Sequence, residues 1–197
     1  GMSAQEGTHK VTPKTGGKAI FIIPSVTTGV ALVTASAATY FGLEGGLENL
    51  FGASKAGALL CLGAASLVAV NAILSGLTID AREKFGVPHP VVYPTEAEIK
   101  DEKARLGFLC HMRAQENFHE WAVTLVPTAF ACALWAEKPF TAGLSLLGFS
   151  GTRLLYAFGY ATGEPKKRTP GFAGSLLFYG LVFGHCVLHG VRGLLGQ

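Results

Sequence analysis

Five long apolar runs alternate with short polar stretches along the chain. They cover roughly residues 22–43, 56–79, 106–135, 139–162 and 171–195. A helix needs about 20 mostly apolar residues to cross the hydrocarbon core of a bilayer, and each run is long enough. The runs are continuous and rich in glycine and alanine, whereas the strands of a membrane barrel would show alternating segments of about ten residues. The pattern therefore predicts an all-α integral membrane protein with five spans.

The composition agrees with a membrane protein. Hydrophobic residues make up 49% of the 197 residues and charged residues 15%, and the mean hydropathy is +0.38. A soluble domain would be less apolar and a disordered chain more charged. The net charge of +3 is small and scattered, so nucleic acid is not an expected partner. We expect buried, reduced thiols at the four cysteines, which lack the spacing of a zinc site: Cys61, Cys110, Cys132 and Cys186.

The distribution of basic residues orients the five predicted spans. Lys and Arg gather in the short loops that face the cytoplasm or its equivalent. Five crossings place eleven of them on one side and three on the other, whereas without the first crossing the ratio would be eight to six. The richer side would hold Lys10, Lys14, Lys18, Arg82, Lys84, Lys100, Lys103, Arg105, Lys166, Lys167 and Arg168, and the poorer side Lys55, Lys138 and Arg192. The N-terminus is predicted to lie on the richer side.

These spans divide the chain into three parts. We predict a polar segment over 1–21, an extra N-terminal transmembrane helix with its loop over 22–55, and a four-helix domain over 56–197. The first run contains Pro24 and several hydroxyl residues, so it suits packing against other helices better than contact with lipid. Residues 1–18 have no apolar core and no Arg, which argues against a secretory signal and against a mitochondrial presequence.

A polar stripe lies within the third run. Thr95 and Glu98 have the spacing of a capping box and predict where this helix begins. Further along, one helix face holds Arg113, Asn117, Glu120 and Trp121, with Gln115 to the side. Charged groups at membrane depth usually pair inside a bundle or a wet cavity, and Glu120 is the expected partner of the arginine. The alternative is purely structural: the stripe would tie helices together through hydrogen bonds of about 1 kcal/mol each.

A second polar row follows in the fourth run. Arg153, Tyr156 and Tyr160 recur on one helix face, and the next loop adds three basic residues, Lys166, Lys167 and Arg168. With five spans, this loop, the Arg82 loop and the start of the third helix share one side of the membrane. Convergent basic and phenolic groups there predict a receptor for a small anion.

Two histidines in the last run have a spacing that is found in metal sites. His185 and His189 are four residues apart, which places both on one helix face. No third ligand is evident in the sequence. We therefore predict no metal site.

Three segments together resemble the MAPEG superfamily, the membrane-associated proteins in eicosanoid and glutathione metabolism. They are "DAREKFGVPHPVVYP", "RAQENFHE" and "RLLYAFGYATGEPKKR", and the resemblance covers about residues 56–195. Within that superfamily the chain is most similar to the microsomal glutathione transferases of the third type. The resemblance implies a left-handed four-helix bundle, a homotrimer, and glutathione bound between neighbouring subunits near the cytosolic face.

The resemblance also assigns roles to residues. Positions that match the glutathione-binding residues of the family are Arg82, Arg113, Gln115, Asn117, Glu120, Tyr156 and Tyr160. In the family, an arginine in the loop that here follows the run 139–162 activates the thiol. Arg168 is the residue we match to it, and Lys167 is the alternative. Trp121 replaces a tyrosine of the leukotriene C synthase branch, and the N-terminal span has no counterpart in the usual four-helix subunit.

Two functions follow as expectations. The first is a glutathione transferase or peroxidase that acts on lipophilic electrophiles or lipid hydroperoxides, with glutathione as co-substrate and no metal. The second is a non-catalytic subunit of a larger membrane complex, such as a mitochondrial one. The extra polar-faced span is the feature that suggests it. Either would place the chain as a multi-pass protein in the endoplasmic reticulum or a mitochondrial membrane.

Overall fold

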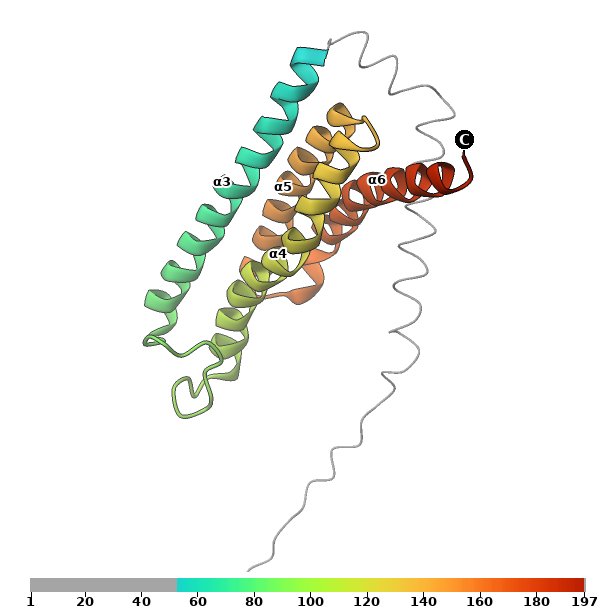
Figure 1. Ribbon diagram of the computed structural model, residues 1–197. Coiled ribbons are helices and arrows are strands. Elements are labelled where there is room, and N and C mark those ends of the chain that lie inside the picture. The colour runs from blue at the N-terminus through green and yellow to red at the C-terminus, as the bar shows by residue number, and fades with distance from the viewer. Residues whose placement is uncertain (1–52, 197) are drawn as a thin grey trace, which may run out of the picture.

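The computed structural model describes residues 53–196, which form four α-helices and one short 3-10 helix (Figure 1). In chain order these are α3 (Ala53–Phe85), α4 (Glu102–Leu134), α5 (Pro139–Ala161), η1 (Pro165–Arg168) and α6 (Thr169–Leu194). No strand occurs within this part of the chain. The predicted N-terminal span at 22–43 and the polar segment before it lie outside the described residues.

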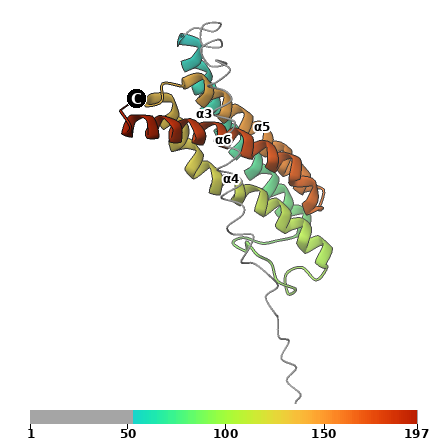
Figure 2. The ribbon, with the colours of Figure 1, turned by 90° about the vertical axis from the view of Figure 1, so that its right-hand side faces the viewer.

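The four helices run up and down, with α5 at the centre of the arrangement. Helix α5 packs against α3, α4 and α6, and Figure 1 shows α3 on one side of it and α6 on the other. The chain direction defines two ends of the bundle. The loop end contains the connection 86–101 and η1, and the turn end contains residues 135–138 and the last turns of α6. Figure 2 shows α6 crossing α4 and α5 as it runs from the loop end to the turn end.

Local chemistry explains where the helices begin and end. The carboxylate of Asp101 accepts hydrogen bonds from the backbone N–H groups of Lys103 and Ala104, at 3.1 and 3.3 Å, and so caps the start of α4. Proline occupies the first turn of both α5 and α6, where its missing N–H costs nothing. Gly86 follows α3 with a φ of 66°, the left-handed conformation that commonly ends a helix.

The predicted start of α4 at Thr95 is wrong by about two turns. Thr95 and Glu98 do interact, because both the backbone N–H and the hydroxyl of Thr95 donate to the Glu98 carboxylate. These bonds lower the pKa of Glu98, the hydroxyl bond most. They close an isolated turn, however, and the helix begins after Asp101. The Thr95–Glu98 spacing therefore predicts a local capping interaction correctly, but this interaction does not lie at the start of α4.

Two helical segments within the described residues are long and apolar enough to cross a membrane, Lys55–Phe85 and Pro165–Leu194. Helices α4 and α5 contain the two polar rows and do not meet the same criterion of length and composition. Helix α4 nevertheless has 33 residues, a length of about 50 Å against a hydrocarbon core of about 30 Å. It can therefore span a bilayer and still project beyond it at the loop end.

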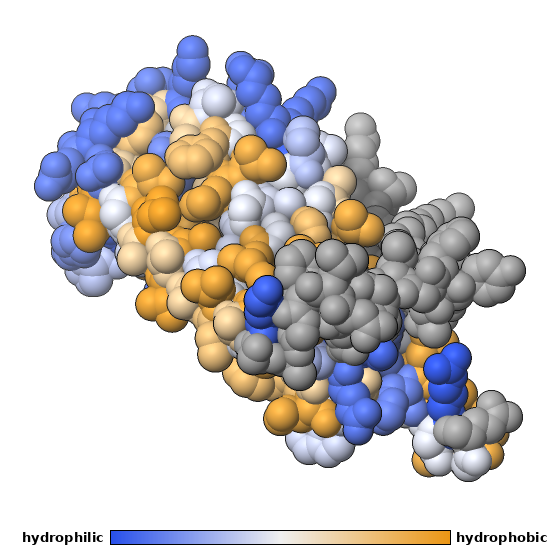
Figure 3. Space-filling model, turned by 90° about the horizontal axis from the view of Figure 1, so that it is seen from above, coloured by the Kyte–Doolittle hydropathy of each residue, from blue (hydrophilic) through white to orange (hydrophobic). Residues whose placement is uncertain are grey.

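Apolar side chains fill the bundle and also cover part of its outside. The core contains Leu125, Leu146, Phe149 and Val182, none of which is exposed. Large apolar side chains are also exposed on α3, and Figure 3 shows hydrophobic residues across the middle of the visible face. The four cysteines are free, as predicted. Cys110 and Cys132 are buried as expected, whereas Cys61 is exposed on α3 and Cys186 is only half-buried.

Glycines let α3 and α5 approach at backbone distance. A Cβ on Gly143 would lie 2.6 Å from the Leu59 carbonyl carbon and 2.6 Å from the Leu60 nitrogen. Gly63 is equally confined, since its Cβ would lie 2.7 Å from the Gly143 oxygen. Small residues at helix crossings permit such close packing in membranes. This crossing fixes the position of α3 against α5.

We expect Gly143→Ala to lower the thermal midpoint of the detergent-solubilised protein, because its methyl group would force α3 and α5 apart. Overpacking of this kind costs about 1–3 kcal/mol. The control is Gly76→Ala in α3, where a Cβ meets nothing within 4 Å. Alanine there should be neutral or stabilising, by at most about 1 kcal/mol. Equal melting shifts in the two variants would show that the close crossing is not required.

Candidate functional site

The polar stripe predicted from the sequence forms a connected row on α4. Arg113 Nη1 lies 2.8 Å from Glu116 Oε2 and 3.5 Å from Glu120 Oε1. Asn117 Nδ2 donates to Glu120 Oε2 at 3.1 Å. We call these four residues the α4 polar row. The expected Arg113–Glu120 pair is present, but Glu116, which the sequence analysis did not single out, is the closer partner.

Arg153 of α5 contacts this row from the interior of the bundle. Its side chain is only 1% exposed, and its Nη1 donates to Asn117 Oδ1 at 2.6 Å. The guanidinium carbon lies 4.8 to 5.3 Å from the ring centroids of Phe149, Tyr156 and Trp121. Within the described residues, its Nε and Nη2 have no hydrogen-bond partner. Aromatic faces therefore replace most of the water that a buried guanidinium loses.

A cavity opens in front of this cluster at the loop end of the bundle. Its volume is about 330 Å³, and α4, α5, η1 and the start of α6 all contribute to its wall. We call it the Arg168 cavity; its lining residues are Arg113, Asn117, Tyr156, Arg168, Thr169 and Phe172. Arg168 Nη1 lies 3.5 Å from the Tyr156 hydroxyl, and its guanidinium carbon lies 5.0 Å from the Tyr160 ring centroid. Two guanidinium groups and a phenol thus surround one space.

Two glycines make this arrangement possible. A Cβ on Gly159 would lie 2.4 Å from the Lys167 carbonyl oxygen, so η1 packs directly on the backbone of α5. A Cβ on Gly171 would lie 2.3 Å from the Tyr156 nitrogen, so the first turn of α6 does the same. Any larger side chain at either position would push the Arg168 segment away from the tyrosines.

A second cavity of about 240 Å³ lies further along α4, and we call it the Trp121 cavity. Glu120, Trp121, Thr124 and Tyr179 line it. The Trp121 ring makes edge contacts with Tyr179 and with Phe172, at centroid distances of 5.2 and 6.2 Å. Because Phe172 also lines the Arg168 cavity, the two spaces are neighbours across one aromatic contact.

Comparison with protein families identifies the fold that builds these cavities. The model of the MAPEG family matches residues 60–188, about two thirds of the chain. The chain belongs to the MAPEG family. The resemblance noted in the sequence is thereby confirmed at the level of the family, and the match lies within the predicted range 56–195. MAPEG proteins are integral membrane proteins that include glutathione transferases and related proteins as well as members without enzymatic activity.

Not every predicted glutathione residue of this MAPEG chain reaches the Arg168 cavity. Arg82 Nη1 donates to the Val91 carbonyl at 2.7 Å, and its guanidinium carbon lies 5.7 Å from the centroid of the Phe108 ring. Gln115 accepts from Thr78 Oγ1 at 3.0 Å and donates to Ser75 Oγ at 2.9 Å, so it faces α3. Within a single chain, Arg82 and Gln115 therefore lie apart from the residues that line the cavity.

The two candidate activators also differ in their surroundings. Lys167 Nζ lies 3.0 Å from Glu164 Oε1, one helical turn away in η1, and Lys167 does not line the cavity. Arg168, the next residue, does line it. The direction in which η1 presents its side chains separates these neighbours, and sequence alone could not.

Several cavity residues were missed from the sequence because their types are common in apolar helices. Thr169 and Phe172 of the Arg168 cavity and Tyr179 of the Trp121 cavity gave no signal of their own. Tyr93 was also missed, and its hydroxyl donates to Glu116 Oε1 at 2.6 Å. This bond to a carboxylate raises the pKa of the Tyr93 phenol. It also ties the 86–101 loop to the α4 polar row.

We expect Arg153→Lys to lower the thermal midpoint, although the charge is retained. An ammonium group cannot bond Asn117 and lie flat against three rings at once, and the lost contacts should cost at least about 1 kcal/mol. A matched control is Arg105→Lys, also on a helix of this bundle. Arg105 pairs with Glu96 only at 3.8 Å, so lysine should be tolerated there. Equal stability of both variants would argue that Arg153 is a replaceable charge.

Proposed function

We propose that this MAPEG protein is a membrane-bound glutathione transferase or peroxidase, most similar in kind to the microsomal glutathione transferases of the third type. One observation supports this most directly. The Arg168 cavity places the Arg168 guanidinium beside the Tyr156 hydroxyl, and Arg113 and Asn117 of α4 line the same space. Its volume falls in the range of about 300–1,000 Å³ that small-molecule sites occupy.

The charges around the cavity match those of glutathione. The tripeptide has two carboxylates, one ammonium group and a thiol. Arg113 can pair with a carboxylate, and Asn117 can donate to one or accept from the peptide N–H groups. Glu120, already hydrogen-bonded to Asn117, can receive the ammonium group. Arg168 and Tyr156 are then left for the sulfur.

Arg168 is proposed as the activator of the thiol. A free thiol with a pKa of about 8.5 is only a few per cent thiolate at neutral pH, and the thiolate is the nucleophile. A guanidinium within hydrogen-bond reach favours the anion and stays charged itself. Lowering the thiol pKa by two units corresponds to about 2.7 kcal/mol. The ion pair of Lys167 with Glu164 makes Lys167 the weaker candidate.

The reaction follows from the thiolate. With an alkylating or arylating substrate, the sulfur attacks the electrophilic carbon, and the leaving group departs with the bonding electron pair. With a lipid hydroperoxide, the sulfur attacks the terminal oxygen and the O–O bond breaks. The lipid leaves as an alkoxide, which takes up a proton equivalent to the one the thiol released and becomes the alcohol. The resulting sulfenic acid of glutathione condenses with a second glutathione to give the disulfide and water. The aromatic Trp121 cavity, next to the thiolate position, is the proposed site for the lipophilic co-substrate.

Arg82 and Gln115 are proposed to serve the cavity of a neighbouring copy in a homotrimer. Both lie at the α3–α4 side of their own chain, away from its Arg168 cavity. A closed ring of three copies brings one face of each subunit to a different face of the next. The glutathione site would then be composite. We further propose that the loop end faces the cytosol, or the equivalent compartment of a mitochondrion, from the membrane of the endoplasmic reticulum or the mitochondrion.

We expect Arg168→Gln to lower glutathione turnover with an aryl halide at neutral pH by about 10- to 100-fold, because the thiol pKa rises by one to two units. Activity should recover as the pH is raised. Lys167→Gln is the matched control, since it removes the adjacent charge, and it should remain close to the parent protein. The glutathione thiolate absorbance of each complex, followed against pH, measures the same shift directly. If Lys167→Gln shows the larger loss, the activator has been assigned to the wrong residue.

The composite site can be tested with mixed trimers. Arg82→Gln and Arg168→Gln should each be poorly active alone. Co-expressed in equal amounts, random mixing leaves about a quarter of the interfaces with both residues intact, so about a quarter of the parent activity should return. Mixed trimers that stay at the level of the separate variants would show that each chain holds a complete site. Recovery of the native particle as a large hetero-complex without glutathione turnover would instead favour the non-catalytic subunit.

A further inference from the structure

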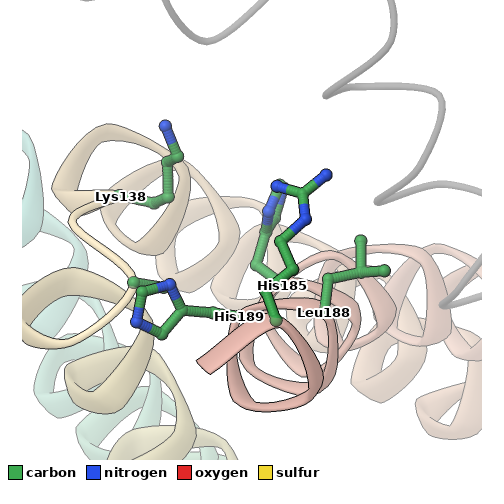
Figure 4. Close-up of a pocket in the computed structure, with 6 residues that line it drawn as sticks. Lys138, His185, Leu188 and His189 are labelled. Carbon is green, nitrogen blue, oxygen red and sulfur yellow. The ribbon is translucent and has the colours of Figure 1, made fainter. Parts of the chain in front are cut away.

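A small basic cavity lies at the turn end of the bundle, away from the Arg168 cavity. Its volume is about 110 Å³, and it is formed by the turn between α4 and α5 together with the last turns of α6. Figure 4 shows Lys138, His185, His189 and Leu188 around it, with the histidines coming from α6. Ala136 and Arg192 complete the lining. We call it the turn-end cavity.

The lining of this cavity suits an anion. Lys138, Arg192 and two imidazoles contribute, and none of the six lining residues is acidic. The positive-inside rule predicts three basic residues on this side of the membrane, Lys55, Lys138 and Arg192. Two of these three residues line the turn-end cavity. Lysine and arginine at a helix bundle bind phosphate through charge-assisted hydrogen bonds. The space admits a group of a few heavy atoms and is too small for a tripeptide.

The backbone of the turn is arranged to present these groups. Glu137 has a φ of 54°, a left-handed conformation that residues other than glycine rarely adopt. Two backbone hydrogen bonds hold the turn: the Lys138 N–H donates to the Cys132 carbonyl and the Ala136 N–H to the Ala131 carbonyl. Lys138 is thereby directed toward the end of α6, where His185 is only 4% exposed.

The surroundings favour a lipid as the source of the anion. Exposed large apolar side chains adjoin the cavity residues in sequence on both elements, Leu134 and Trp135 before the turn and Val191 and Leu194 on α6. Their exposed fractions run from 49% to 90%. Tryptophan is enriched where a membrane meets water. A soluble anion needs no such rim, whereas a phospholipid carries its phosphate only a few bonds from the start of its acyl chains.

We propose that the turn-end cavity binds the phosphate of a phospholipid head group, in the leaflet opposite the Arg168 cavity. Lys138 and Arg192 supply the charge, the imidazoles donate hydrogen bonds, and Trp135 and Leu194 lie against the acyl chains. This site is separate from the proposed glutathione site, and it does not depend on whether the protein is an enzyme.

The test measures lipid adducts of the delipidated protein by native mass spectrometry. Three lipids with the same acyl chains are compared: phosphatidylglycerol, phosphatidylcholine and diacylglycerol, the last of which has no phosphate. A retained adduct is expected with the phospholipids and not with diacylglycerol. Arg192→Gln and His189→Gln, both at exposed positions, should each weaken the phospholipid adduct about tenfold. Lys55→Gln, which removes one exposed cation from the same predicted side, should leave it unchanged.

The following results would contradict the proposal. Equal retention of diacylglycerol, or equal loss of the phospholipid adduct in Lys55→Gln, would overturn the head-group site. Inorganic phosphate is the second arm, measured as a rise of the thermal midpoint. A rise that Arg192→Gln abolishes, without any lipid adduct, would overturn the lipid assignment and identify soluble phosphate as the ligand. The elution volume of each variant on size exclusion shows that it remains folded.

Discussion

The candidate site depends on a buried guanidinium. Arg153 sits inside the bundle at 1% exposure, where an unpaired charge would cost several kcal/mol. Three aromatic faces and one amide oxygen offset that cost. Three of these four partners also contribute to the cavities: Tyr156 and Asn117 line the Arg168 cavity, and Trp121 lines its neighbour. The contacts that stabilise this one buried charge therefore also hold side chains that line both cavities.

A series of polar contacts connects the buried Arg153 to exposed side chains of α4. Asn117 accepts from Arg153 and donates to Glu120, Glu120 pairs with Arg113, and Arg113 pairs with Glu116. Arg153 is buried and Asn117 half-buried, whereas the Glu120 and Arg113 side chains are 54% and 46% exposed. The inner contact is therefore held by geometry and the outer pairs by weaker, water-screened attraction. An incoming tripeptide can exchange with the outer pairs at low cost while the inner contacts keep their shape. That gradient suits a site that must bind and release a charged substrate.

The two ends of the bundle differ in what their basic residues face. At the loop end, Arg168 and Arg113 border a space large enough for a tripeptide and lie beside tyrosines. At the turn end, Lys138 and Arg192 border a space for a single small group, with exposed apolar residues beside it. The first arrangement suits a soluble anion that reacts, and the second suits an anion attached to the membrane. In each cavity the cations come from different elements: Arg113 of α4 and Arg168 of η1 at the loop end, and Lys138 of the turn and Arg192 of α6 at the turn end.

The sequence by itself determined the helices from residue 53 onward, the two polar rows and the family. Hydrophobic period and span length are properties of neighbouring residues, so the Arg113–Glu120 and Arg153–Tyr160 faces could be read directly. The tertiary structure decided which residues of the two polar rows line the same cavity. Arg82 and Gln115 face away from it, Lys167 forms an ion pair with Glu164, and α4 begins at Glu102 and not at Thr95. The Gln115 contacts with α3 and the close approach at Gly159 and Gly171 are contacts between helices, which no local pattern along the chain encodes. The Lys167–Glu164 pair and the Asp101 cap are local contacts that the sequence patterns did not single out.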